Sequence, residues 1–248
     1  MTYQIQTRNK PCTLELKLQS NGEREIFAIG YDPSKRDTVF FKRIMHVDGI
    51  HTFYFGMPQS PKTLKFVIYD NRERRFTDPQ TFKIISLKVL RLRKAPTEAG
   101  WLTRSYIKFI QQFSIDLPFL SPGSYTDDKE RFIINLFPGR LEYATPARIE
   151  KRLNFIEVSK TDFERMTIPQ RMIILLHEYS HNFLNKHQDS EIEADTNALR
   201  IYCGLGYPFI EGIYAFTHIL KDSDFNMERL QSIEDFMIKH RLYIDKKG

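Results

Sequence analysis

The sequence has few of the features that mark secreted scaffolds and membrane proteins. It contains only two cysteines, Cys12 and Cys203, which are too few for a disulfide framework and are typical of a reducing compartment. The first residues are polar and lack the apolar core of a signal peptide. No apolar run approaches the length of a membrane span. We therefore expect a cytoplasmic protein that makes no membrane contact.

Internal repeats and low-complexity tracts are also absent, and the charge is unevenly distributed. Residues 1–100 hold 18 Lys and Arg against 10 Asp and Glu, whereas the rest of the chain holds 19 against 21. The basic charges of the first part are scattered among strand-like segments, which is typical of a solvated surface. They also suit an acidic protein partner. No nucleic-acid-binding motif accompanies them, so we do not expect a nucleic-acid partner.

Residues 1–92 alternate between apolar and polar positions, which is the pattern of half-buried strands. Gly, Pro, Asn and Asp turn signals divide this region into seven short strands. The expected strands are 3–6, 13–18, 25–29, 38–44, 52–55, 63–69 and 81–87. Seven short strands in about ninety residues are typical of an immunoglobulin-like β-sandwich. Because this region holds no catalytic constellation, we expect it to serve docking or assembly.

A charged and then small, polar stretch at 91–100 contains both Pro and Gly, and it predicts a boundary between domains 1–92 and 93–248. In the second domain, helical periodicity predicts helices at 101–115, 190–202, 209–220 and 227–241, with a loop at 117–126. Two strands are expected at 131–137 and 153–158. The chain is therefore α+β, and its second part is mainly helical with a small sheet. An exposed edge of such a sheet can pair with an extended peptide.

One motif suggests chemistry. His181 is four positions after His177, so on a helix both imidazoles project from one face, as two ligands of a single zinc ion require. Glu178 stands beside the first histidine, where it can accept a proton without being a ligand. Five apolar residues, 172–176, precede the motif and predict a buried helix. A capping-box pattern from Thr167 to Gln170 predicts where that helix starts.

A catalytic zinc with two histidine ligands needs a third protein ligand. Glu191 and Asp195 are four apart at the start of the next predicted helix and so share one face. If Glu191 binds the metal, Asp195 can reach the other ring nitrogen of a ligating histidine and fix its tautomer. Carboxylates at a helix N-terminus are also favoured by the helix dipole, which accounts for Glu191 but not for Asp195.

The rival ligand is His187, ten residues after His177. This is the separation in the longer metzincin motif, which has a glycine at the position that Leu184 occupies in this chain. Leucine is poorly suited to the left-handed turn at that point, and Asn185 would tolerate the turn but shifts the spacing. We favour Glu191 for this reason and keep His187 as the alternative.

The paired motif, His177-Glu178-x-x-His181 followed by Glu191-x-Glu-Ala-Asp195, resembles the gluzincin class of zinc metallopeptidases. It is similar in particular to the Ste24/HtpX-like and ImmA/IrrE-like peptidases. The resemblance spans about 25 residues and implies a zincin-like domain, with Zn²⁺ as the cofactor. It makes the two histidines and Glu191 ligands, Glu178 the general base and Asp195 a partner of a ligating histidine. The link between His181 and Glu191 is short, and the membrane helices of the Ste24/HtpX-like proteins are absent.

These observations predict a zinc-dependent endopeptidase that hydrolyses a protein or peptide substrate, with Glu178 as general base. Such a site usually adds a donor for the oxyanion, and the following helices offer four candidates: Tyr202, Tyr207, Tyr214 and His218. The sequence does not select among them. The alternative is a catalytically lapsed zincin-fold adaptor that uses the β-sandwich for assembly, although a purely structural site has no need of Glu178.

Overall fold

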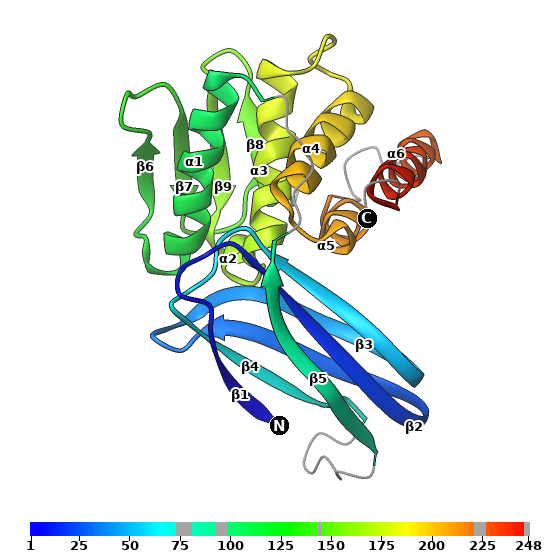
Figure 1. The fold of residues 1–248 in the computed structure, drawn as a ribbon. Coiled ribbons are helices and arrows are strands. Elements are labelled where there is room, and N and C mark those ends of the chain that lie inside the picture. The colour runs from blue at the N-terminus through cyan, green and yellow to red at the C-terminus, as the bar shows by residue number, and fades with distance from the viewer. Residues whose placement is uncertain (73–80, 93–98, 143–144, 221–226, 246–248) are drawn as a thin grey trace. The chain divides into compact units, whose positions relative to one another are not determined.

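The structure, a computed structural model, describes residues 1–72, 81–92, 99–142, 145–220 and 227–245. The protein is α+β and forms two compact units (Figure 1). The first unit comprises Met1–Lys94 and Gly206–Pro208, and the second comprises Ala95–Leu205 and Phe209–Gly248. Most of the predicted linker, residues 93–98, lies outside the described residues, so the division at 92/93 stays a prediction.

The first unit is built around one long β-hairpin. Its five strands are β1 Thr2–Gln6, β2 Cys12–Asp32, β3 Lys35–Met57, β4 Thr63–Asp70 and β5 Phe82–Arg91. β2 pairs with β3 from end to end, with β5 through its first half and with β4 through its second half. β1 extends the sheet beyond β4.

This hairpin folds back on itself, so that two halves of one sheet face each other. The rings of Phe41 and Phe55, both on β3, stack with their centroids 4.3 Å apart, although a straight strand would separate them by roughly 46 Å. A bulge interrupts the β2–β3 pairing between Ser20 and Arg24. Gly22 and Gly49 beside it adopt positive φ angles of 79° and 74°, which only glycine adopts without strain. Figure 1 shows both strands turning back at this point.

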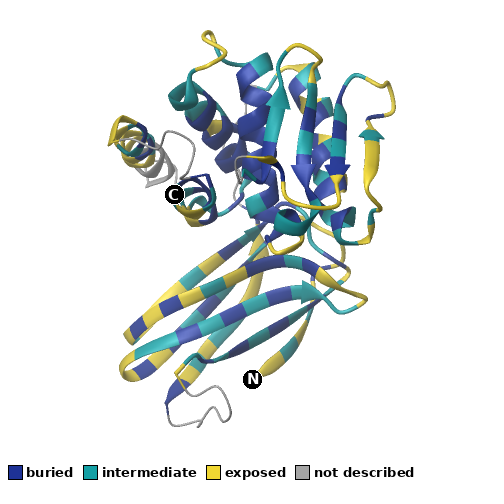
Figure 2. Cartoon of the chain, turned by 180° about the vertical axis from the view of Figure 1, so that it is seen from behind, coloured by how far each residue is buried: buried dark blue, intermediate teal, exposed yellow. Residues whose placement is uncertain are grey.

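The prediction of seven separate strands is therefore corrected to five. Two pairs of predicted strands are continuous, because the turn signals near residues 20–22 and 48–49 mark a bend that β2 and β3 make together and not a hairpin turn between separate strands. Alternation was correctly indicated: inward-facing Leu14, Leu16, Ile26 and Ala28 are fully buried, and Figure 2 shows buried and exposed positions alternating along these strands. The immunoglobulin-like arrangement itself stays a prediction.

The second unit contains a small mixed sheet in the order β6-β7-β9-β8. Its strands are β6 Gly123–Thr126, β7 Ile133–Phe137, β8 Ala147–Glu150 and β9 Phe155–Ser159. β7 and β9 are the two expected strands and run parallel, whereas β6 and β8 pair antiparallel to them at the two edges. The edge strands differ from the prediction: β6 lies in the segment expected to be a loop. Both have only four residues, too short for a clear alternation.

Helices make up the rest of this unit. They are α1 Trp101–Asp116, η1 Leu117–Phe119, α2 Lys160–Glu164, α3 Ile168–Phe183, α4 Glu191–Leu205, α5 Phe209–Tyr214, the π-helical η3 Ala215–Ile219 and α6 Met227–Asp245. α1 and α3 cover one face of the sheet (Figures 1 and 2), and the Tyr106 hydroxyl of α1 donates to the Leu175 carbonyl of α3 at 2.8 Å. None of the described helices has the length and apolar character needed to cross a bilayer.

Helix α3 is the buried centre of this unit. Its residues from Met172 to His181 are all buried, which Figure 2 shows as an almost uniformly buried helix. The predicted capping box is confirmed: Gln170 N donates to the Thr167 hydroxyl at 3.4 Å, and Thr167 N donates to the Gln170 side chain at 3.0 Å. The cap fixes where the helix begins, and therefore which face carries the histidines.

Arg171 ties three helices together from within this core. Its fully buried guanidinium donates to the carbonyls of Phe163 (2.8 Å) and Glu164 (3.4 Å) in α2 and Ser114 (2.6 Å) in α1. Because Arg171→Gln would leave buried carbonyls without donors, we expect it to lower the free energy of unfolding of this unit by about 3 kcal/mol. Urea unfolding followed by fluorescence of the single tryptophan, Trp101 of α1, measures this change.

The matched control is Arg104→Gln, which changes an exposed arginine on α1. Surface substitutions of this kind stay within about 0.5 kcal/mol. An Arg171→Gln midpoint that matched the Arg104→Gln midpoint would show that the buried guanidinium does not hold these helices together.

Candidate metal centre

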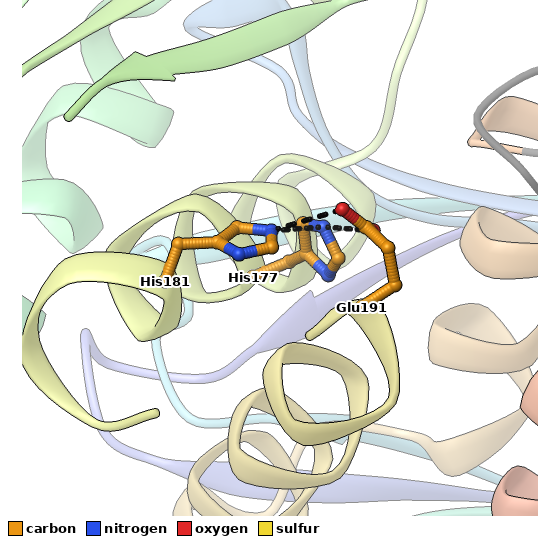
Figure 3. A group of neighbouring side chains, drawn as sticks. All are labelled: His177, His181 and Glu191. Atoms are coloured by element: carbon orange, nitrogen blue, oxygen red, sulfur yellow. Dashed lines mark hydrogen bonds and ion pairs between the residues drawn. The ribbon is translucent and has the colours of Figure 1, made fainter. Parts of the chain in front are cut away.

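His177, His181 and Glu191 converge on one point (Figure 3). The two Nε2 atoms of the histidines are 3.2 Å apart. Glu191 places Oε2 3.2 Å from His177 Nε2 and Oε1 3.4 Å from His181 Nε2. Both histidines are buried and Glu191 is partly buried. This cluster of two imidazoles and one carboxylate could hold a metal ion.

The second ring nitrogen of each histidine lies close to an oxygen atom. His181 Nδ1 lies 2.7 Å from the Gln188 carbonyl. His177 Nδ1 lies 2.9 Å from Asp195 Oδ1, a charged contact without the alignment of a hydrogen bond. A carbonyl can only accept, so His181 carries its proton on Nδ1 and presents the lone pair of Nε2 to the cluster. Asp195 favours the same tautomer for His177. Both rings are thus oriented as metal ligands require.

Glu191 reaches the histidines because the chain turns between α3 and α4. The Asn185 side chain donates to the Ser190 carbonyl at 2.8 Å, and the Ser190 hydroxyl accepts from Glu193 N at 3.2 Å at the start of α4. Helix α4 then packs against α3. Glu191 and Asp195, four residues apart, both face His177, as the shared helical face predicts.

The rival residue His187 lies elsewhere. Its side chain is 81% exposed, and its Nδ1 is 2.9 Å from Glu193 Oε1. Glu193 also accepts from the backbone amides of Lys186 (2.7 Å) and His187 (3.1 Å). His187 and Glu193 therefore stabilise the turn between the helices, and the structure brings Glu191, not His187, to the two histidines.

Glu178 lies beside the cluster without joining it. Its Oε2 accepts from the backbone N–H of Ile149 in β8 at 2.8 Å. Burial, with a smaller contribution from the Glu191 carboxylate, raises the pKa of Glu178 to about 7, despite the lowering effect of His177. Such a carboxyl group can both take up and release a proton near neutral pH.

The charges around the cluster favour a cation. Burial opposes protonation of His177, but the carboxylates of Asp195 and Glu191 outweigh it and raise its pKa to about 10. Burial likewise opposes ionisation of Glu191, yet the nearby histidines and Arg229 lower its pKa to about 2. The Glu191 carboxylate is therefore negative at neutral pH and creates a site for positive charge beside the imidazole nitrogens.

Arg229 is a residue beside the cluster that the sequence did not reveal. It lies in α6, is almost fully buried, and donates to both oxygens of Asp195, from Nε at 2.8 Å and from Nη2 at 3.0 Å. The sequence pattern that could have indicated its burial is the helical spacing to Ile233 and Phe236, four and seven residues later, on the apolar face of an amphipathic helix. That pattern marks a buried position and says nothing about its partner.

None of the four candidate oxyanion donors is selected by the structure. Tyr202 is fully buried, and the Tyr207 hydroxyl donates to Gln59 within the first unit at 3.1 Å. Tyr214 and His218 stack on each other, with ring centroids 4.6 Å apart, and both are exposed. From the same region, Phe216 of η3 lies beside the cluster, with its ring centroid 5.9 Å from that of His177.

The residues present fit a metal ion. Glu191 Oε2 is buried without a well-aligned hydrogen bond, although it points toward His177 Nε2. Buried oxygens are normally satisfied, and a cation between the two imidazoles and the carboxylate would satisfy it. No protein-family model, curated protein or solved structure matches this chain.

Proposed function

We propose that this protein is a zinc-dependent endopeptidase. The observation that carries the proposal is the separation of roles between two neighbouring residues. His177 faces the convergence point, whereas Glu178 is held 2.8 Å from Ile149 N and takes no part in the ligand set. A purely structural metal site has no use for a buried carboxylate held in this way.

The donor set suits zinc better than the common alternatives. Two imidazoles and one carboxylate form a typical ligand set of catalytic zinc and leave one coordination position open, whereas Ca²⁺ and Mg²⁺ prefer oxygen ligands. Bound there, zinc would polarise the scissile carbonyl group and acidify a water molecule. The assignment to a gluzincin, with a zincin-like fold for the second unit, is part of this proposal.

The chain's own residues supply the proton transfer. With Oε2 of Glu178 held by Ile149 N–H, Oε1 is the oxygen that accepts the proton from water. A pKa raised to about 7 by burial allows the same carboxyl group to pass this proton to the leaving amine. Phe216 beside His177 helps to exclude bulk water.

An extended peptide is the substrate that the neighbouring strand fits. Among the described residues β8 pairs only with β9, so no strand covers its other edge, where Glu178 accepts from the N–H of Ile149. Ser159 N donates to Pro146 O, and because antiparallel pairs alternate, the backbone groups of Ala147 and Ile149 point away from β9. They lie on the side of the strand that reaches Glu178. A peptide strand added there would pass beside the general base.

For the first unit we propose an immunoglobulin-like fold and a role in docking to another protein. We propose that the protein is cytoplasmic. The excess of basic residues in 1–100 favours an acidic protein surface as its partner. The alternative is an adaptor protein that has lost its catalytic activity but still binds the metal. It predicts bound zinc with no hydrolysis of any peptide.

Metal removal tests the proposed function. The purified protein is expected to carry about one zinc ion per chain and to cleave a mixed peptide library. Dialysis against a chelator should abolish cleavage, and stoichiometric zinc should restore it. Cleavage that persists in metal-free protein, or a chain that binds no zinc, would contradict the proposal.

A further inference from the structure

Arg229 joins the C-terminal helix to the ligand cluster. Its guanidinium makes two contacts with Asp195, at 2.8 and 3.0 Å, and a longer one with Glu191 Oε2 at 3.5 Å. Arg229 and Asp195 are each only 1% exposed. The shorter, paired contacts identify Asp195 as its main partner, in the two-pronged geometry that arginine forms with carboxylates.

Asp195 passes this constraint to a ligand. Its Oδ1 lies 2.9 Å from His177 Nδ1, a charged contact that is short but lacks the alignment of a hydrogen bond, so the position of the carboxylate influences how the ring is turned. The opposite nitrogen, His177 Nε2, is the one that faces His181 and Glu191, each at 3.2 Å. A carboxylate with both oxygens held cannot rotate, and the ring that it contacts is held with it.

We propose that Arg229 is a positioning residue of the metal site, acting on His177 through Asp195. This inference rests on the proposed function, because it assigns a role toward the same metal. It makes α6, which contributes no ligand, part of the machinery that sets metal affinity. The link joins residues 34 positions apart in sequence and forms where α6 packs against α4.

Zinc affinity measured by chelator competition tests the inference directly. Arg229→Gln is expected to weaken zinc binding by on the order of 10- to 100-fold, which is the typical effect of removing a residue that orients a metal ligand. The zinc affinity of Arg229→Lys should lie between those of the wild type and Arg229→Gln, because an ammonium group keeps the charge but cannot bond to both carboxylate oxygens in the same geometry. The absorption spectrum of the Co²⁺-loaded variants should shift as well, since a turned imidazole alters the ligand geometry.

A second background shows whether Arg229 acts through Asp195. In Asp195→Asn, adding Arg229→Gln should weaken zinc binding by less than about 3-fold, because residues in one network are not additive. This double variant also removes both buried charges together, so it is expected to fold even if the unpaired carboxylate unfolds the single variant.

The matched control is Arg171→Gln, which changes the other fully buried arginine of this unit. Arg171 donates to backbone carbonyls of α1 and α2, so the folded variant should keep wild-type zinc affinity within about 2-fold. Wild-type affinity in Arg229→Gln, an undiminished loss in the Asp195→Asn background, or an equal loss in Arg171→Gln would each overturn the inference. Absence of zinc binding in the wild type itself would overturn the proposed function and this inference together.

Discussion

Glu178→Gln should lower the rate of peptide hydrolysis by about 10²- to 10⁴-fold, the contribution of a positioned general base, while leaving the zinc content unchanged. Glutamine has nearly the same shape, and its side-chain carbonyl can still accept from Ile149 N–H. It cannot take a proton from water near neutral pH. Cleavage of a peptide library and metal analysis of the same preparation measure the two effects separately.

The control for this variant is Glu164→Gln. Glu164 lies in α2, where its half-exposed carboxylate pairs with Lys160, so its loss should leave hydrolysis at the wild-type rate. If Glu178→Gln lost zinc together with activity, Glu178 would be a ligand and not the general base. Full activity would remove the general base from the mechanism.

Glu191→Ala should strip zinc from the protein or weaken zinc binding by more than about 100-fold. Removing a ligand has a larger effect than removing a residue that only orients a ligand. Its two oxygens lie 3.2 and 3.4 Å from the histidine nitrogens. Asp195→Asn, which acts on His177 only through Nδ1, should lose less. Competition with a chromophoric chelator ranks the variants.

His187→Ala is the matched control for this ranking, because it also changes a candidate ligand on the same turn. Its side chain is 81% exposed and pairs with Glu193, so zinc binding should be unaffected. The opposite order, with zinc lost in His187→Ala and kept in Glu191→Ala, would show a metzincin-like site. Glu191 would then serve only the N-terminus of α4.

The cluster of His177, His181 and Glu191 could be predicted because helical geometry governs it. Spacings of four residues place side chains on one face, and the capping box fixes the start of α3, so local sequence determined which groups point together. The choice between Glu191 and His187 depended on how the chain turns after Phe183. The sequence favoured the outcome only because leucine occupies the position of the expected glycine.

The edge strands and Arg229 could not be predicted, for two different reasons. β6 and β8 are four residues long, and their extended form comes from pairing with β7 and β9 more than from a pattern of their own. Arg229 pairs with a carboxylate 34 residues away. Nothing local distinguishes an arginine that will be buried against Asp195 from one that will lie in solvent.

In the first unit, periodicity gave the strands but not their continuity. Asn-Gly and Asp-Gly sequences at 21–22 and 48–49 are strong hairpin signals. In this protein Gly22 and Gly49 supply positive φ angles for a bend that two paired strands make together. The same positive φ angles suit a hairpin turn or a bend, and contacts between distant residues, such as the packing of Phe41 on Phe55, favour the bend.

The folded-back hairpin also has a consequence for how this unit folds. β2 and β3 run through both halves of the sheet. The register in which they pair therefore decides which side chains face inward in both halves. A slip of one residue would turn the inward-facing sets of both halves outward together. That register starts at the Asp32–Lys35 turn, where Asp32 Oδ1 accepts from Ser34 N at 2.8 Å and from the Ser34 hydroxyl at 2.6 Å. This exposed turn, together with the register shifts at Gly30–Asp32 and Ser20–Arg24, therefore specifies which residues of β2 and β3 enter the core.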